Sequence, residues 1–116
     1  MHAPLTTNCR QFGLITIVDL HGSIELGEAS LTLRHTIRDL VESGRTKIIL
    51  NFSEVHSIDS AGVGELAGAY VPVKSKGGEL KVLNPTKKVH GVLQITQLDR
   101  VFGVYTDEQM AIRSFC

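Results

Sequence analysis

Hydrophobic residues along the chain change their spacing several times, and each change predicts a different element. Short runs of apolar and β-branched residues at 5–10 and 13–20 predict two strands. The brief gap at Gln11–Phe12 predicts a hairpin, so these strands are expected to pair antiparallel. From Glu28 to Ser43 the apolar positions recur every three or four residues, which predicts an amphipathic helix that ends before Gly44.

The second half of the chain continues this alternation of strand and helix patterns. Further strands are predicted at 47–52, 79–84 and 101–105, and further helices at 63–73 and 87–96. The segment "SEVHS" after the first of these strands has the composition of a polar turn. Thr106, with Gln109 three residues later, matches a capping box and predicts a last helix.

The predicted order is β-β-α-β-α-β-α-β-α, which is typical of the α/β class. Strands that alternate with helices indicate a largely parallel sheet covered by about four crossover helices, and the first hairpin makes that sheet mixed. The chain has 116 residues, and it contains no repeat, linker or low-complexity segment. We therefore expect one domain over residues 1–116. The pattern alone does not predict the order of the strands in the sheet.

The charge balance excludes some classes of partner. Twelve basic and twelve acidic residues leave a formal net charge of zero, which argues against binding to nucleic acid or to an anionic membrane. No secretory leader and no apolar run of membrane-spanning length is seen, so a cytoplasmic protein is expected. Cys9 and Cys116 lie near opposite ends without metal-type spacing, and we expect reduced thiols, although a disulfide between them stays open.

The segment "IDSAGVGEL" at 58–66 is the strongest candidate for chemistry. It places Asp59 and Ser60 just beyond a predicted buried strand, where ligands and partners of α/β folds gather. Gly62 and Gly64 leave the backbone approachable, and the start of a helix tolerates a phosphate well. The alternative favoured by spacing alone is structural, with Ser60 as a helix N-cap and Gly62 in a tight turn.

Catalytic interpretations of this segment have little support. A nucleophile elbow requires G-x-S-x-G, but Ile58 and Gly62 flank Ser60, and His56 has no third partner for a triad. No phosphate-binding P-loop is present. The five histidines show no pair at ligand spacing, and the carboxylates form no evident pair. We therefore expect no enzyme activity, no metal site and no cofactor.

The segment "IILNFSEVHSIDSAGVGEL" closely resembles the signature of the STAS domain, in particular that of bacterial anti-sigma-factor antagonists. "VDLHGSIELGEASLTLRHTI" resembles the second strand and first helix of that family. The C-terminal half, including "GGEL" and "LDRVF", also resembles it, so the likeness covers nearly the whole chain. The resemblance implies the STAS-like fold.

The resemblance also implies a function without catalysis. In that family the serine at the position of Ser60 is phosphorylated by an anti-sigma factor, a serine kinase with a histidine-kinase-like ATPase fold, and a PP2C-type phosphatase removes the phosphate. The unmodified protein binds the anti-sigma factor, which then releases its sigma factor, and the phosphorylated protein does not bind. The output implied is regulation of transcription, as in stress responses. A scaffold role in a signalling complex, with no direct sigma-factor output, is the alternative.

The resemblance predicts a partner-binding face around Ser60. Its other members are expected to be Asp59, Ala61, Gly62, Val63, Glu65, Ser23 and Glu25. For Asp59 an ordinary turn role stays open, as do plain surface or core roles for Ser23, Glu25, Val63 and Glu65.

Three departures from the family pattern bear on that face. Gly22-Ser23-Ile24-Glu25 stands where Gly-x-Leu-Asp is usual, which makes the acidic side chain one methylene longer. Ala61 stands where a second hydroxyl is often found, and this leaves Ser60 as the acceptor at that step. Pro72 falls within the predicted second helix, where it is expected to cause a kink or to remove a hydrogen bond.

Overall fold

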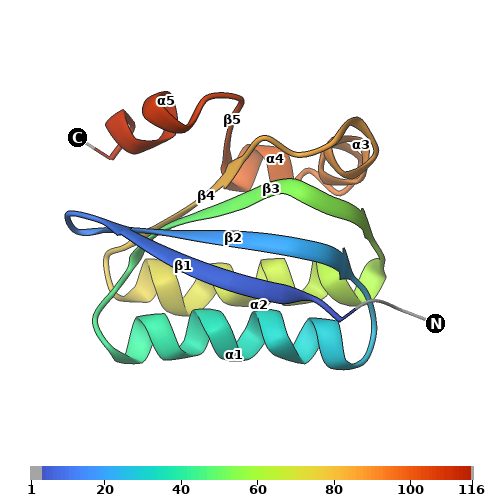
Figure 1. The fold of residues 1–116 in the computed structure, drawn as a ribbon, viewed down its shortest axis with the longest axis horizontal. Coiled ribbons are helices and arrows are strands. Elements are labelled where there is room, and N and C mark those ends of the chain that lie inside the picture. Colours follow the sequence, from blue (N-terminus) through green and yellow to red (C-terminus); the bar gives the residue numbers. More distant parts are fainter. Residues whose placement is uncertain (1–3, 116) are drawn as a thin grey trace.

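Five strands form one mixed sheet in the computed structural model, which describes residues 4–115 (Figure 1). They lie side by side in chain order: β1 (Thr6–Phe12), β2 (Ile15–Ile24), β3 (Lys47–Ile58), β4 (Glu79–Leu83) and β5 (Gly103–Tyr105). β1 pairs antiparallel with β2, and every other pairing is parallel. The predicted mixed, largely parallel α/β sheet is thereby confirmed.

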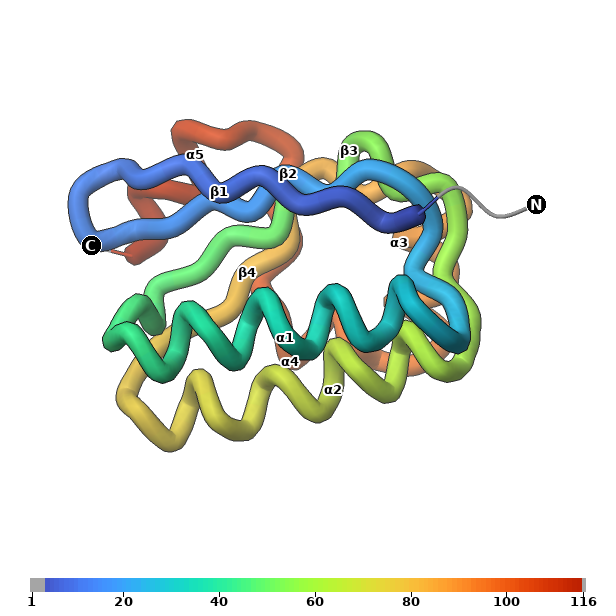
Figure 2. The backbone as a smooth tube through the Cα atoms, turned by 60° about the horizontal axis from the view of Figure 1, so that its bottom comes forward, coloured from blue at the N-terminus to red at the C-terminus, as the bar shows by residue number. Residues whose placement is uncertain are grey.

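Five helices connect and follow the strands. They are α1 (Glu28–Glu42), α2 (Ser60–Ser75), α3 (Lys87–Ile95), α4 (Leu98–Val101) and α5 (Glu108–Arg113). α1 and α2 lie side by side across one face of the sheet, while α5 lies on the opposite face (Figures 1 and 2). α3 packs on the C-terminal half of β3, where the Thr86 hydroxyl reaches the carbonyl of Val55 at 3.4 Å.

The hydrophobic core has two parts because alternate residues of a strand point to opposite faces of the sheet. The larger part lies under α1 and α2, where Leu50 of β3 belongs to the same cluster as Leu33 and Leu66. The smaller part lies under α5, where Ile17 and Ile49 belong to a cluster with Ala111 and Ile112. The central strands are therefore apolar on both faces, as expected of a sheet covered on both sides.

The first hairpin turns two residues later than predicted. Phe12 pairs with Ile15, so the connection consists of Gly13 and Leu14. Gly13 has a φ of 63°, which a glycine adopts without strain. The prediction of a strand from 13 to 20 was wrong at its start because Leu14 extends the apolar run while its side chain is 78% exposed.

β3 is twice as long as predicted, and "SEVHS" is part of this strand rather than a turn. Buried positions along this stretch are Phe52, Val55 and Ile58, three residues apart instead of two. The pairing with β2 shifts register on both sides of Gly22, which explains the irregular spacing. Because of this shift, the second half of β3 does not show the strict alternation of buried and exposed residues by which a strand is predicted.

The C-terminal region differs from the prediction in two details. The four-residue helix α4 was not predicted, so five helices are present rather than about four. The N-cap of α5 is Asp107, not Thr106, because the Asp107 carboxylate accepts a hydrogen bond from the Gln109 N–H at 3.2 Å.

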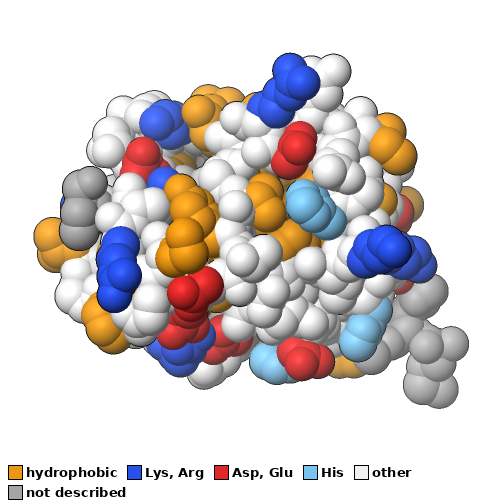
Figure 3. All heavy atoms as spheres, turned by 90° about the horizontal axis from the view of Figure 1, so that it is seen from above, with side chains coloured by type: hydrophobic (Ala, Val, Ile, Leu, Met, Phe, Trp, Pro, Cys, Tyr) orange, Lys and Arg blue, Asp and Glu red, His pale blue; other side chains and the backbone are white. Residues whose placement is uncertain are grey.

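The surface carries charges of both signs. On the face seen in Figure 3, basic and acidic side chains are interspersed. Within residues 4–115, no helix is long and apolar enough to cross a membrane.

Candidate functional site at the start of helix α2

The candidate site lies at the edge of the sheet where β2 and β3 end. Because these strands run parallel, their carboxyl ends meet, and Ile24 pairs with Ile58 at that edge. The loop from β2 into α1 and the start of α2 therefore come together. Residues some thirty positions apart in the sequence form one local surface.

Asp59 holds the two segments together. Its Oδ1 accepts a hydrogen bond from the Gly62 N–H, and its Oδ2 accepts one from the Leu26 N–H, each at 3.0 Å. Its own N–H donates to the carbonyl of Ile24 at 3.2 Å. The hydrogen bond from Leu26 and then that from Gly62 hold the pKa of the Asp59 carboxyl below its usual value, because both stabilise the charged form.

Ser60 is the first residue of α2 and its side chain is exposed. The N-cap of this helix is Asp59, which has an extended backbone and a capping side chain, so the prediction of Ser60 as the cap was wrong. Within residues 4–115, nothing accepts from or donates to the Ser60 hydroxyl. The hydroxyl therefore faces solvent at the positive end of a sixteen-residue helix.

Gly62 is required by packing rather than by a tight turn, so the turn prediction was wrong. A Cβ on Gly62 would overlap the carbonyl oxygen of Ile24 and lie 2.6 Å from Cγ1 of Ile58. Gly64 is different, because a Cβ there would meet nothing within 4 Å. Ala61, between the serine and Gly62, is half-buried.

Ser23 and Glu25 gather around a serine of the neighbouring strand. The Ser57 hydroxyl lies 2.9 Å from the Ser23 hydroxyl and 3.4 Å from Oε2 of Glu25. The structure thus brings both predicted residues to the edge that carries Asp59. All three side chains are half-buried, which leaves part of each open to a partner.

Val63 and Glu65 both contact other parts of the domain. Val63 is half-buried and packs against the larger core. Glu65 accepts a double hydrogen bond from the Arg34 guanidinium of α1, with Nε–Oε2 at 2.9 Å. Arg34 lowers the pKa of the Glu65 carboxyl, since the charged form is stabilised. These two residues are thus engaged within the domain.

Two residues of this surface were not predicted. Leu26 is 82% exposed, and its backbone is held by Asp59. Ser57 links Ser23 to Glu25. Leu26 could have been predicted, because it is an apolar residue between Glu25 and the glycine that precedes α1. Ser57 was missed because the segment "SEVHS" was mistaken for a turn.

The surroundings of Ser60 within residues 4–115 were compared with the arrangements that catalysis and metal binding require. His56 is exposed on β3 and makes no hydrogen bond to this serine. No group of three or more His, Cys, Asp or Glu side chains in the described chain could hold a metal ion. Cys9 is an exposed free thiol on β1, and the predicted alternative of a disulfide to Cys116 lies outside the described residues.

Known proteins resemble this chain in sequence and in fold. The sequence profile of the STAS domain matches residues 6–111. A candidate anti-sigma factor antagonist from Thermotoga neapolitana is 31% identical over 91 residues, which is 78% of this chain and 80% of the relative. A candidate anti-sigma factor antagonist from Thermotoga maritima superposes with a TM-score of 0.83 at 25% identity, covering 93% of this chain and 92% of that one. The anti-sigma factor antagonist SpoIIAA in its unphosphorylated form has a TM-score of 0.79 at 25% identity, covering 94% and 96%.

Proposed function

The chain belongs to the STAS domain family, and we propose that it acts there as a phosphorylation-switched antagonist of an anti-sigma factor. Unmodified, the protein binds a serine-kinase anti-sigma factor with a histidine-kinase-like ATPase fold, and the sigma factor is released. Phosphorylation of Ser60 by that kinase blocks binding, and a PP2C-type phosphatase restores it. The protein itself catalyses nothing in this scheme.

The observation that carries the proposal is that two adjacent residues have separate roles. Asp59 caps α2 and anchors the neighbouring loop, while Ser60 leaves its hydroxyl exposed and unbonded within the described residues. A phosphate on Ser60 would therefore displace no hydrogen bond that holds the fold together. SpoIIAA, whose structure is similar, is known in a phosphorylated and in an unphosphorylated form, which supports this type of regulation.

A single phosphate can supply the loss of binding free energy that the switch requires. A phosphate carries about −1.5 to −2 charges at neutral pH. Next to Asp59 the new charge is repelled, and the amide groups at the start of α2 offset only part of that repulsion. A thousandfold loss of affinity requires about 4 kcal/mol. An unpaired charge buried in an interface costs about 2–5 kcal/mol, so one phosphate suffices.

The proposed docking face contains Ser60 and Asp59 together with the loop that Asp59 anchors. Leu26 offers an exposed apolar side chain, and Ser23 and Glu25 offer polar groups beside it. An apolar anchor surrounded by polar groups is the usual composition of a transient interface.

Purified protein and the genome-encoded kinase test the switch directly. Kinase and radiolabelled ATP should label the wild type and the control Ser53→Ala, whose serine lies on the exposed part of β3, but not Ser60→Ala. Calorimetry should show that Ser60→Asp binds the kinase at least a hundredfold more weakly than Ser60→Ala. Equal labelling of all three proteins would refute Ser60 as the acceptor. Equal binding by Ser60→Asp and wild type would instead indicate a constitutive scaffold.

A further inference from the structure

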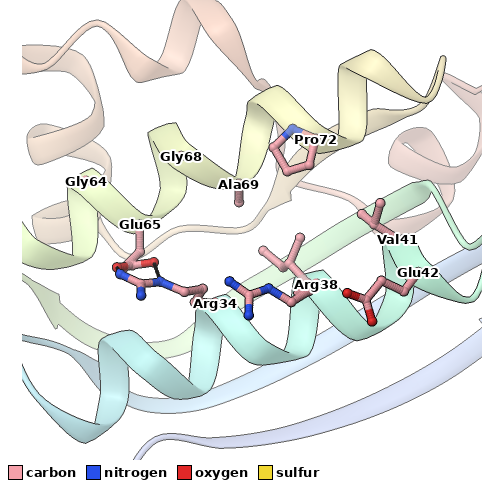
Figure 4. Close-up of a pocket in the computed structure, with 10 residues that line it drawn as sticks. Arg34, Arg38, Val41, Glu42, Gly64, Glu65, Gly68, Ala69 and Pro72 are labelled. Atoms are coloured by element: carbon pink, nitrogen blue, oxygen red, sulfur yellow. Dashed lines mark hydrogen bonds and ion pairs between the residues drawn. The ribbon is translucent and has the colours of Figure 1, made fainter.

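A second site lies in the groove between α1 and α2, away from Ser60. The two helices leave between them a cavity of about 510 Å³ (Figure 4). Small-molecule sites have volumes of about 300–1,000 Å³, so this cavity has the size of a ligand pocket. Its α1 side includes Arg38 and Val41, and its α2 side includes Gly64, Gly68 and Pro72.

The cavity exists because one face of α2 lacks side chains. Gly64 and Gly68 are four residues apart and so lie on the same face of the helix. A Cβ on either glycine would meet nothing within 4 Å. Neither residue is therefore required for contact between the helices, and the space in front of the α2 backbone is open.

The Arg34–Glu65 ion pair lies at one end of the groove (Figure 4). There the Arg34 guanidinium is neutralised by Glu65 through two hydrogen bonds. Arg38 has no ion pair within residues 4–115, and its side chain extends along the groove toward the Arg34–Glu65 pair (Figure 4). The apolar side chains of Val41 and Pro72 lie toward the other end, where the Glu42 carboxylate also lies (Figure 4).

We propose that this groove binds a small monocarboxylate with an apolar chain, such as a medium-chain fatty acid. The carboxylate pairs with Arg38, whose guanidinium matches two carboxylate oxygens in plane. The hydrocarbon chain of the ligand lies between Val41 and Pro72 and covers these apolar side chains. Glu42 also lines the groove, on the side of Val41 (Figure 4), so a ligand with one negative charge, which the Arg38 guanidinium can neutralise, is favoured over a dianion.

The length of the groove suits a single hydrocarbon chain. Its α1 wall extends from Arg34 to Glu42, which is about 12 Å at the helical rise of 1.5 Å per residue. A single hydrocarbon chain with one head group fits the length.

Decanoate is a suitable probe, used below its micellar concentration and followed by amide chemical shifts in NMR. Binding should saturate, and the shifts should concentrate on Gly64, Gly68 and residues 38–42. Arg38→Gln should weaken binding at least tenfold, while Arg45→Gln, an exposed arginine beyond the end of α1, should not change it. Decyltrimethylammonium, with the same chain and the opposite charge, should not bind.

Gly68→Leu provides an independent test because a leucine side chain would fill the groove. A Cβ at Gly68 would meet nothing within 4 Å, and circular dichroism should confirm that the variant keeps its fold. Decanoate shifts should then disappear from the groove. Unsaturated or scattered shifts in the wild type, or wild-type affinity in both Arg38→Gln and Gly68→Leu, would overturn the proposal. None of these outcomes depends on phosphorylation of Ser60.

Discussion

At the scale of single residues, two glycines of α2 have opposite roles although they are only two positions apart. A methyl group on Gly62 would strike the backbone at Ile24, which cannot move without disturbing β2. We expect Gly62→Ala to lower the free energy of unfolding by about 1–3 kcal/mol, the usual cost of overpacking. Gly64→Ala should raise it by about 0.5–1 kcal/mol, since alanine favours a helix. Urea denaturation of the two variants measures both effects, and equal effects would contradict the packing described at Gly62.

Asp59 links stability to pH. Its pKa is lowered in the folded protein by the N–H groups of Leu26 and Gly62, so the folded state binds this proton less tightly than the unfolded state. The stabilisation is therefore fully present above the unfolded pKa of about 3.9 and is lost as pH falls through the lower folded pKa. Asp59→Ala should cost about 1–2 kcal/mol at pH 7, typical of a lost cap.

The measurement is a comparison of urea unfolding for wild type and Asp59→Ala across pH. The difference between the two proteins should be constant near neutrality and should shrink below about pH 4. A difference that stays constant down to pH 2 would mean that the Asp59 charge contributes nothing.

Sequence reasoning placed Asp59 and Ser60 between a buried strand and a helix, as the structure does, but assigned the cap to the wrong residue. Serine and aspartate are both favoured N-caps, so composition could not choose between them. The choice depends on the extended backbone of Asp59 and on its contact with Leu26, thirty-three residues earlier. Contacts between segments that distant in the chain are not visible in a local pattern.

At the scale of elements, Pro72 lies inside α2, and the helix continues to Ser75. Proline has no N–H to donate to the carbonyl of Gly68, and its ring crowds that carbonyl. We expect Pro72→Ala to raise the free energy of unfolding by about 1–3 kcal/mol, since alanine restores the bond. Thermal and urea unfolding would show the gain, and Val71→Ala, an exposed neighbour, is the control. A Pro72→Ala protein less stable than wild type would mean that the proline ring contributes more by packing than it costs.

Elements whose buried residues recur at a regular spacing were predictable from the sequence, and the others were not. α1 has four buried residues at helical spacing, and its prediction differs by a single residue. β3 was cut short because the register shift near Gly22 moves its buried positions three residues apart. α4 spans four residues, which is too short to show a helical period.

At the scale of the whole molecule, the proposed switch should leave the fold unchanged. Ser60 is exposed, and its hydroxyl holds nothing together within residues 4–115. Ser60→Asp should therefore change the free energy of unfolding by no more than about 0.5 kcal/mol, as is usual for surface positions. Denaturant unfolding measures this, and a loss of several kcal/mol would show that a negative charge acts on folding rather than on docking.

The class of fold followed from the alternation of periods, but the sheet order did not. Parallel strands joined by helices can be arranged in several orders, and a local pattern does not distinguish them. Here neighbouring strands in the chain are also neighbours in the sheet. That order places the ends of β2 and β3 side by side, and so it assembles the candidate site from two distant segments.

The two edges of the sheet also bear on behaviour at high protein concentration. β5 is a three-residue edge, too short to template another strand for long. β1 is longer, but its side chains are mostly exposed and polar, with Arg10 held by Asp19 and Glu108 across neighbouring elements. A charged, polar edge discourages strand addition and amyloid-like stacking. Both edges of the sheet therefore disfavour aggregation of the protein with itself.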